Sequence, residues 1–311
     1  MRLIQTNDNL PKVVVLLAAY NGIRYIEDQL NSILNQAQVD ITVYVSIDKS
    51  SDGTEVLLSN WALKESRLKL LPFGVRFGSA GSNFYRLIKE VDFLSYDYVA
   101  YADQDDIWSL YKTTNQIKLM EIYRAHAVSS DIIAFGREQK NRLIVKSHPQ
   151  KEFDYIFESA GPGCSFLMKP SLVDKIYHQL MQEDSLAAKV IMHDWLTYSI
   201  CRAYGMRWHI DSTPTLKYRQ HSSNVIGANL GLRSMLSRYL RVQKGWYRAE
   251  VSKICRVCFD INGDKNLFKL INILDRKSFL YNLLLLPYVF KGRRKIVDRL
   301  FLVIMVFLCV F

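Results

Sequence analysis

The first half of the chain alternates short apolar runs with stretches in which apolar residues recur every three or four positions. The apolar runs are rich in β-branched residues, as buried parallel strands are, and they occupy residues 13–19, 41–47, 68–73 and 98–102. The stretches between them have the spacing of amphipathic helices. This alternation predicts an α/β fold with a mostly parallel, Rossmann-like sheet flanked by helices.

Polar residues predict where several helices begin. Asp52 or Thr54 is expected to cap a helix that runs through Trp61, and Ser82 or Asn83 to open one that runs through Leu94. Asp194 stands ahead of another helical pattern, where it is either the N-cap or a functional acid.

The last third has a different pattern. Residues 232–248, placed on a helical wheel, separate a basic arc from an apolar arc, which predicts a basic amphipathic helix despite Gly245. Two apolar runs, 279–290 and 300–311, flank a Lys/Arg cluster at 291–295. Each has 12 residues, fewer than the roughly 20 that span a bilayer, so interfacial or re-entrant burial is expected.

Charge divides the chain in the same way. The formal net charge of the chain is +11, yet its Lys and Arg residues are concentrated after Arg219 and the part before it is close to neutral. We therefore expect a catalytic domain over residues 1–225 and a basic, membrane-associating helical region over 226–311. The alternative for the basic arc is a solvated face of a helix packed on the protein.

Polar residues follow three of the predicted strands. They are Tyr20 and Asn21, then Asp48, then Asp103 with Asp105. Because the carboxyl ends of parallel strands form one edge of a sheet, these side chains are expected to converge on one crevice. The chain contains no G-x-G-x-x-G after the first strand and no G-x-x-x-x-G-K-[ST], so a phosphate would be held in another way.

Three carboxylates within four residues, Asp103, Asp105 and Asp106, follow an apolar strand. Their mutual repulsion is relieved by a cation, and hard carboxylate oxygens suit Mg²⁺ or Mn²⁺ together with substrate phosphates. The simpler alternative is a solvated acidic turn.

Residues 161–164 contain two glycines. These glycines either allow the backbone to approach a ligand closely or form a simple turn.

Five short segments resemble those of the bacterial family-2 glycosyltransferases, in the same order. They are Ala19-Tyr20-Asn21, residues 45–54, residues 103–108, Gly163-Cys164 and His193-Asp194-Trp195. Within that family the chain is most similar to rhamnosyltransferases of O-antigen and capsule assembly. The resemblance covers roughly residues 12–225.

The resemblance implies a GT-A fold and a nucleotide-diphosphate sugar donor. By it, Tyr20 and Asn21 line the nucleotide pocket, Asp48 contacts the base, and Asp194 is the catalytic base. Asp103 and Asp105 form the D-x-D pair, with Asp105 the direct ligand of Mg²⁺ or Mn²⁺. Further nucleotide-sugar contacts are expected from Ala19, Asn83, Gly163, Cys164 and His221, and His221 could touch the diphosphate or the metal.

Two departures from the family pattern refine this expectation. Ile47 replaces the first of two acids that usually end the second strand, so base recognition falls to Asp48 alone. The chain lacks Q-x-x-R-W, the mark of processive members, which favours addition of a single sugar.

The implied reaction is one inverting displacement, in which Asp194 takes the proton of an acceptor hydroxyl and the metal neutralises the leaving diphosphate. The expected donor is dTDP-L-rhamnose, and the expected acceptor is a saccharide linked to undecaprenyl diphosphate. The basic region would then hold the enzyme on anionic lipid at the cytoplasmic face of the inner membrane.

Cysteine usage and the N-terminus agree with a reducing cytoplasm. The five cysteines are too scattered for a disulfide framework, and Cys255-x-x-Cys258 lacks a second ligand pair for zinc. Residues 1–12 are polar and lack the apolar segment of a signal peptide.

Other functions remain open at this point. A UDP-hexose could replace the rhamnose donor. A basic protein that binds membrane or nucleic acid without catalysis is also compatible with a pI of 9.3, but the basic residues lie among apolar runs, which favours lipid over nucleic acid. A nucleotidyltransferase would show a Gly-rich basic loop after the first strand, and a glycosidase would need neither metal nor nucleotide.

Overall fold

A seven-stranded sheet forms the centre of the protein. The computed structural model describes residues 10–136, 139–221, 245–276 and 278–309. The sheet order is β10-β6-β9-β4-β1-β2-β3, and only β9 runs antiparallel to its neighbours. The strands are β1 (Lys12–Ala19), β2 (Asp40–Ile47), β3 (Leu68–Leu70), β4 (Tyr98–Ala102), β6 (Ala127–Ser130), β9 (Leu167–Met168) and β10 (Trp208–Asp211). The predicted mostly parallel α/β fold is confirmed.

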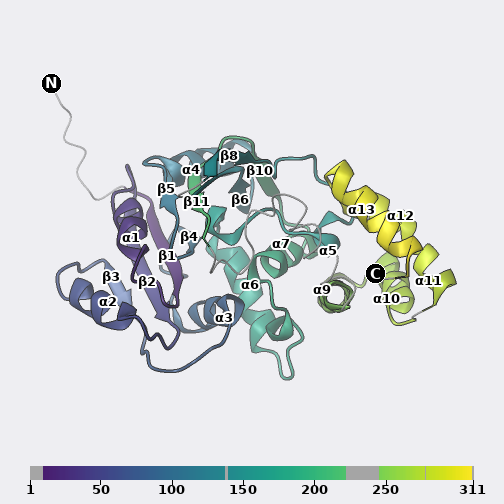
Figure 1. The fold of residues 1–311 in the computed structure, drawn as a ribbon, viewed down its shortest axis with the longest axis horizontal. Coiled ribbons are helices and arrows are strands. Elements are labelled where there is room, and N and C mark those ends of the chain that lie inside the picture. Colours follow the sequence, from purple (N-terminus) through teal and green to yellow (C-terminus); the bar gives the residue numbers. More distant parts are fainter. Residues whose placement is uncertain (1–9, 137–138, 222–244, 277, 310–311) are drawn as a thin grey trace.

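Alternate residues of β1 contribute to two different cores. Val13, Val15 and Leu17 pack with α1 (Ile26–Leu34), α2 (Thr54–Ala62) and α4 (Lys112–Ile122). Val14 and Leu16 pack on the opposite face with α3 (Ala80–Glu90), α6 (Pro170–Met181) and α7 (His193–Ala203). Because both faces are covered, every side chain of β1 after Lys12 is buried, which is why the strand is an unbroken apolar run (Figure 1).

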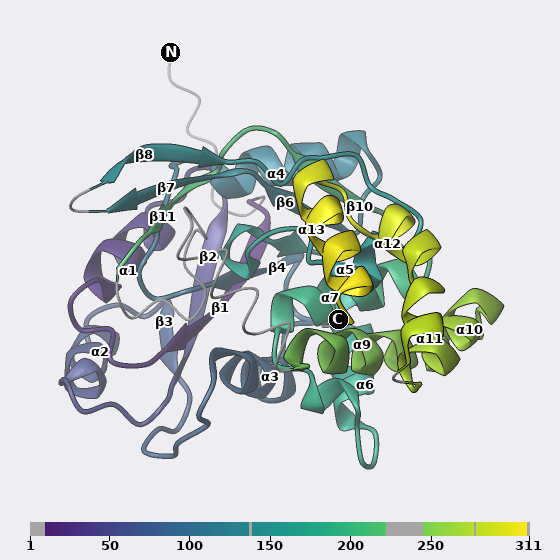
Figure 2. The same ribbon diagram turned by 45° about the vertical axis from the view of Figure 1, so that its right-hand side comes forward.

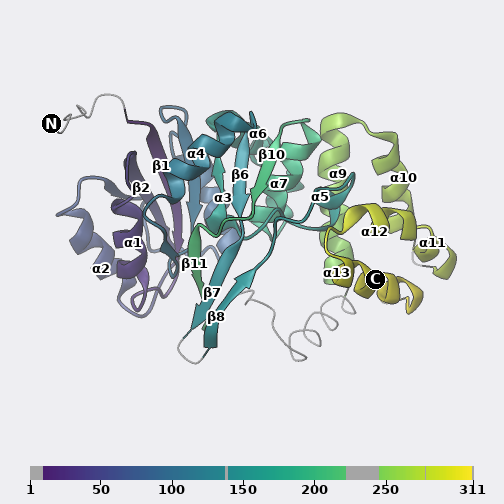
Figure 3. The ribbon, with the colours of Figure 1, turned by 90° about the horizontal axis from the view of Figure 1, so that it is seen from above.

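A second sheet of four strands carries one side of the candidate site. Its order is β5-β11-β7-β8, with β5 (Ile107–Trp108), β11 (Leu216–Arg219), β7 (Ile132–Gly136) and β8 (Gln139–Ile144). The β7–β8 hairpin projects from the body, as Figure 3 shows. Strand β11 pairs with β5, so the residues after β11 are brought beside the acids that precede β5.

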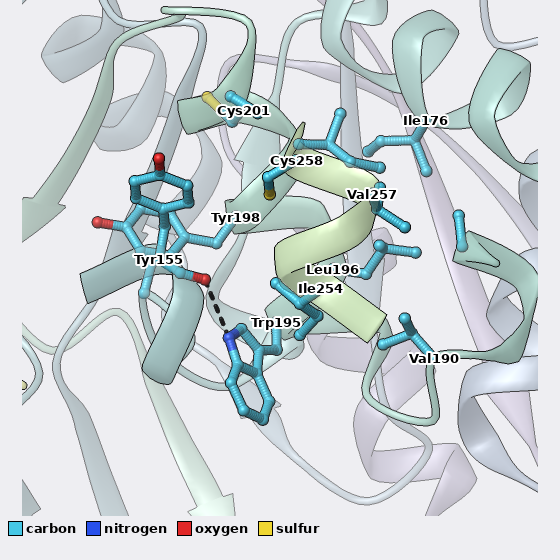
Figure 4. Packing of buried hydrophobic residues seen from close by; sticks show 14 of the residues in the cluster. Tyr155, Ile176, Val190, Trp195, Leu196, Tyr198, Cys201, Ile254, Val257 and Cys258 are labelled. Atoms are coloured by element: carbon cyan, nitrogen blue, oxygen red, sulfur yellow. Dashed lines mark hydrogen bonds between the residues drawn. The ribbon is translucent and has the colours of Figure 1, made fainter. Parts of the chain in front are cut away.

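The C-terminal helices extend the core around α7. They are α9 (Trp246–Asn262), α10 (Lys265–Leu274), α11 (Phe279–Leu283), α12 (Leu286–Gly292) and α13 (Ile296–Phe307). Ile254, Val257 and Cys258 of α9 pack against α7 in the same cluster as Leu196 (Figure 4). The predicted boundary between residues 225 and 226 falls outside the described residues, but the helices beyond it share one hydrophobic core with the sheet domain (Figure 2).

Several predicted boundaries were wrong by two to four residues, including the end of α3, which is Glu90 and not Leu94. Helix α3 begins at Ala80 with Ser79 as its N-cap, because the Ser79 hydroxyl accepts the Ser82 N–H. Strand β3 ends at Leu70, shortly before Pro72. Asp194 is the second residue of α7, whose N-cap is Met192, so Asp194 is not the N-cap.

The predicted amphipathic helix over 232–248 lies mostly outside the described residues. Its end is described and differs from the prediction: Gly245 has a φ of 74° and α9 starts after it. Arg248, expected on the basic face, is buried and donates to the carbonyls of Leu274 and Ile273 and to Asn282 Oδ1. It therefore caps the end of α10 from within the protein.

Helices α11–α13 leave many apolar side chains exposed. The exposed set, called the apolar ridge below, is Phe279, Leu280, Leu284, Phe290, Ile296, Val297, Leu300, Ile304, Phe307 and Leu308. Among the described helices, none combines the length and the hydropathy needed to cross a membrane.

All five cysteines are free. Cys309, just beyond α13, is exposed, and the other four are buried, Cys255 and Cys258 within α9.

Candidate active site

The loop after β1 is fastened to the acidic loop after β4. Gln104 Oε1 accepts the Tyr20 N–H at 2.8 Å, and Gln104 Nε2 donates to the Tyr20 carbonyl at 2.8 Å. A Cβ at position 22 would lie 2.3 Å from Gln104 Oε1, so this pairing needs Gly22. The phenol of Tyr20 is half exposed and Asn21 Oδ1 accepts the Ser51 N–H at 2.8 Å. Gln104 thus joins two predicted site segments, a role that its place between two aspartates did not reveal.

Asp48 and Asn83 tie neighbouring segments together at the ends of β1 and β2. The two carboxylate oxygens of Asp48 accept the N–H groups of Phe77 and Gly78 at 2.8 and 2.9 Å. The Asn83 amide donates to the carbonyls of Ala19 and Ser46 at 3.4 and 3.0 Å. Base contact by Asp48 stays a prediction; the contact described is with the loop that covers it, and a carboxylate oxygen can accept a second hydrogen bond.

Asp103, Asp106 and Cys164 meet beneath the end of β4. One ligand atom from each lies within 4.8 Å of the other two. Burial, and then the charge of Asp105, raise the pKa of both Asp103 and Asp106. Burial also raises the pKa of the Cys164 thiol well above its usual value. The described part of the chain offers no hydrogen-bond partner to Asp106 Oδ2. A group of buried carboxylates in this state favours a bound cation.

Asp105 faces His221, which lies two residues after the end of β11. The distance between His221 Nε2 and Asp105 Oδ2 is 2.6 Å. The imidazole stacks on Tyr25, with ring centroids 5.1 Å apart. Arg219 fixes this arrangement, because its Nε donates to the Asp105 carbonyl at 2.8 Å while its guanidinium covers the Tyr25 ring at 4.6 Å. The predicted metal ligand and the predicted histidine are therefore brought together.

Lys112, which the sequence pattern did not single out, is a buried basic residue below the acidic cluster. Its ammonium lies 3.9 Å from the centroid of the Trp108 ring and donates to Gln116 Oε1 at 2.9 Å. Burial lowers the pKa of Lys112 to about 7, while the nearby Cys164 and Asp106 raise it. Its position in the first turn of an amphipathic helix gave no signal, since lysines there are usually solvated.

Asp194 occupies a buried position at the start of α7. Burial raises its pKa to about 6, although the Trp195 N–H, the Lys146 ammonium and the Ser159 side chain each lower it. A carboxyl group with a pKa near neutrality is suited to accept a proton. The charge of Asp194 also contributes to the raised pKa of Asp103, so the two acids share one site.

His193 and Gly163 set the shape of the wall beside Asp194. The imidazole stacks on Phe84 with ring centroids 3.9 Å apart. A Cβ at position 163 would lie 2.5 Å from His193 Nε2, so the close approach requires glycine. Burial lowers the pKa of His193 to about 3, which leaves it neutral at physiological pH.

The predicted residues therefore form two groups. Asp103, Asp105, Cys164, Asp194 and His221 gather at the carboxyl edge of the central sheet, with Gly163 beside them. Ala19, Tyr20, Asn21, Asp48 and Asn83 organise the ends of β1 and β2 and the loops that follow. The acid Asp106 and the basic residues Lys112, Lys146 and Arg219 complete the surroundings of the first group.

Comparison with known proteins gives agreeing results. The family model described as glycosyl transferase family 2 matches residues 14–185. The dTDP-rhamnosyl transferase RfbG of Shigella flexneri is 37% identical over 296 residues, which are 95% of this chain and 100% of that protein.

Two further comparisons are more distant. An Escherichia coli enzyme, UDP-Glc:alpha-D-GlcNAc-diphosphoundecaprenol beta-1,3-glucosyltransferase WfaP, is 25% identical over 159 residues, 49% of this chain and 58% of that protein. Among solved structures, the mannosyltransferase PcManGT from Pyrobaculum calidifontis in complex with GDP-Man and Mn²⁺ matches with a TM-score of 0.53 at 16% identity. That match covers 98% of this chain and 82% of the other, and at this identity it shows the fold alone.

Proposed function

The chain belongs to glycosyl transferase family 2, and from this membership we propose that it moves L-rhamnose from dTDP-L-rhamnose to a hydroxyl of a lipid-linked saccharide. It is a glycosyltransferase with a GT-A-like α/β fold. The observation that carries the proposed donor is similarity over nearly the whole chain to a protein named as a dTDP-rhamnosyl transferase. A UDP-hexose donor is the alternative.

The acidic cluster fits a divalent cation. Carboxylate and imidazole are ligands that Mn²⁺ accepts, while Mg²⁺ prefers oxygen alone. Asp105 and His221 would hold the ion, with Asp103 close by, and the charge of the ion would offset the repulsion between acids that helps to raise the pKa of Asp103 and Asp106. When bound, such an ion supplies charge that stabilises a leaving diphosphate.

Residues of both groups would also orient the donor. The half-exposed Tyr20 ring and the Asn21 loop offer a surface for the nucleoside, with Asp48 behind it. Gly163 lets the backbone approach the sugar closely, and the buried, protonated Cys164 packs below. Asn83 holds the β1 and β2 ends at a fixed spacing, which places both loops.

Asp194 would act as the general base. An acceptor hydroxyl at this wall transfers its proton to the Asp194 carboxylate as its oxygen attacks the anomeric carbon. The bond from that carbon to the diphosphate breaks in the same displacement, so the configuration inverts. Lys146 helps to keep Asp194 ionised, and the neutral His193 excludes water on one side.

Two features support a lipid-linked acceptor at the cytoplasmic face of the inner membrane. The apolar ridge is bordered by the exposed cations Lys291 and Lys295, a combination that suits the surface of an anionic bilayer. In addition, the similar WfaP is named for a diphosphoundecaprenol-linked substrate. The ridge itself would lie on lipid while the site faces the water phase.

The test is transfer from a panel of sugar nucleotides, with Mn²⁺, Mg²⁺ or EDTA, to acceptor lipid extracted from bacterial membranes. We expect turnover of dTDP-L-rhamnose that EDTA abolishes and that Asp105→Ala and Asp194→Asn each remove. Turnover of a UDP-hexose instead would select the alternative donor. Failure with every donor, together with salt-sensitive binding to nucleic acid, would refute the transferase proposal.

A further inference from the structure

Two loops flank Asp194, and the C-terminal helices hold both of them. The first loop, residues 157–159, consists of the last residue of α5 (Asp154–Phe157) and the two residues after it. The second, residues 190–192, leads directly into α7.

Residues between α12 and α13 fasten the first loop. The Phe157 carbonyl accepts hydrogen bonds from Tyr247 Oη at 2.6 Å and Arg293 Nη1 at 2.9 Å. Arg294 contacts the two following residues: its backbone N–H donates to Glu158 Oε1 at 2.6 Å, and its Nη2 donates to the Ser159 carbonyl at 2.5 Å. The Arg294 side chain is 2% exposed and also pairs with Asp154 at 3.4 Å.

Helix α5 carries this constraint to the start of α7. Trp195, the neighbour of Asp194, donates its Nε1–H to the Tyr155 carbonyl at 3.0 Å, and Tyr198 Oη donates to Asp154 Oδ2 at 2.9 Å. Gly292 reinforces the arrangement, since a Cβ there would lie 2.3 Å from the Phe157 ring. The turn between α12 and α13 is thus packed against the segment that holds the first turn of α7.

Helix α9 fastens the second loop. Glu250 Oε2 accepts the Ile191 N–H at 2.9 Å, and the Glu250 side chain is 1% exposed. Lys253 pairs with Glu250 and donates to the Lys189 carbonyl at 2.7 Å. From the other side, Tyr85 Oη of α3 donates to the Val190 carbonyl at 2.8 Å. The backbone three residues before Asp194 is therefore held between α3 and α9.

We propose that the C-terminal helices are part of the catalytic apparatus, with Arg294 and Glu250 as positioning residues that fix Asp194 through the two loops. This inference rests on the proposed function, in which Asp194 is the base. It assigns the region after residue 245 a role in the chemical step in addition to any contact with lipid.

The test compares variants of the full chain. Arg294→Lys keeps the charge but loses the forked donor pair, and Glu250→Ala frees the Ile191 N–H. We expect each to lower kcat about 10- to 100-fold while the donor KM changes less than about twofold, since misplacement of a base affects only the chemical step. Glu250→Gln retains an acceptor for Ile191 and should recover most of the lost kcat.

A second readout is the pH profile. Asp194 is faced by Lys146 after β8, Asp103 after β4, Tyr101 of β4 and Tyr85 of α3, none of which changes in these variants. Glu250→Ala should therefore move the acidic limb of kcat upward by about half a pH unit, because displacement of Asp194 weakens the hydrogen bond that its ionised form accepts from the Trp195 N–H.

Controls come from the same helices. Glu152→Ala breaks the exposed pair with Lys291, and Arg256→Lys alters the exposed pair with Asp275; both should keep the unaltered enzyme's kcat. A folded Glu250→Ala protein with unchanged kcat and pH profile would overturn the inference, even if Arg294→Lys failed to fold. Full activity in Asp194→Asn would instead refute the proposed base.

Discussion

His221 Nε2 lies 2.6 Å from Asp105 Oδ2, although 116 positions separate the two residues in the chain. The pairing of β11 with β5 brings them together, and Arg219 locks the contact by binding both the Asp105 carbonyl and Asp28. A carboxylate and an imidazole at this distance share a hydrogen bond, and both groups are ligands that Mn²⁺ accepts.

We therefore predict that His221→Ala raises the Mn²⁺ concentration needed for half-maximal activity by at least about tenfold, with little change at saturating metal. Titration of Mn²⁺ into the protein, followed by electron paramagnetic resonance, would measure the loss directly. His209→Ala is the matched control, because His209 lies in β10 at the edge of the seven-stranded sheet and stacks on Tyr123. Equal Mn²⁺ affinity in both variants would exclude His221 as a ligand.

The pH dependence of transfer should follow Asp194. Its pKa is raised to about 6, and a base acts only when ionised, so the rate should fall as the pH drops through about 6 and level off above it. The neighbouring His193 has a pKa lowered to about 3 and does not titrate in this window. Asp194→Asn should lose about 10²- to 10⁴-fold in kcat and show no acidic limb near pH 6. If the residual activity of Asp194→Asn still falls below about pH 6, the group that titrates there is not Asp194.

Gly163→Ala should reduce the activity of the protein more than its stability. The added Cβ would press on His193 Nε2 and so displace the residue before Asp194. We expect kcat to fall about tenfold or more with the donor KM less affected. Gly205→Ala, where a Cβ meets open space but φ is 69°, should cost stability of about 1 kcal/mol and leave kcat unchanged. Similar kcat in the two variants would contradict the prediction.

Asp48→Asn tests whether the loop over Asp48 shapes the donor pocket. An amide has one acceptor oxygen, so either the Phe77 or the Gly78 N–H loses its partner, at a cost of about 1–3 kcal/mol in the free energy of unfolding. The donor KM should rise while kcat stays within a few fold. Asp92→Asn, at an exposed position, is the control for both quantities. An unchanged KM with reduced stability would limit Asp48 to a structural role.

The apolar ridge predicts binding to vesicles. Burying one such side chain in lipid contributes about 1.5–3 kcal/mol, so Ile296→Glu with Val297→Glu should reduce the protein bound to phosphatidylglycerol vesicles by tenfold or more. Val56→Glu, on an equally exposed position of α2, should not. Cosedimentation measures both. Equal binding by the two proteins would show that the ridge does not contact lipid.

The parts of the fold predicted well are those in which local pattern and tertiary packing agree. The bounds of β1, β2 and β4 follow from apolar runs that are buried on both faces, and α1 from a single apolar stripe. The start of α3 was misplaced, because its cap Ser79 lies in a loop with no periodicity that is itself held by Asp48.

The site was predictable only where its residues carry a local signal. Asp103 and Asp105 stand out as clustered acids, and Asp194 through the motif around it. Lys112, Lys146 and Arg294 give no such signal, since each is one basic residue among many and its function follows from burial beside acids distant in sequence. Arg248 was expected on the basic face of an amphipathic helix, because a helical wheel does not show what the helix packs against.

The distribution of thiols makes this protein unusually easy to label at one place. Burial raises the pKa of Cys164, Cys201, Cys255 and Cys258, which suppresses the thiolate that maleimides attack, whereas Cys309 is exposed at the end of α13. An environment-sensitive fluorophore attached to the unmodified sequence would therefore sit beside the apolar ridge. Its emission would report transfer of that end of the molecule from water to lipid in real time, without any engineered cysteine.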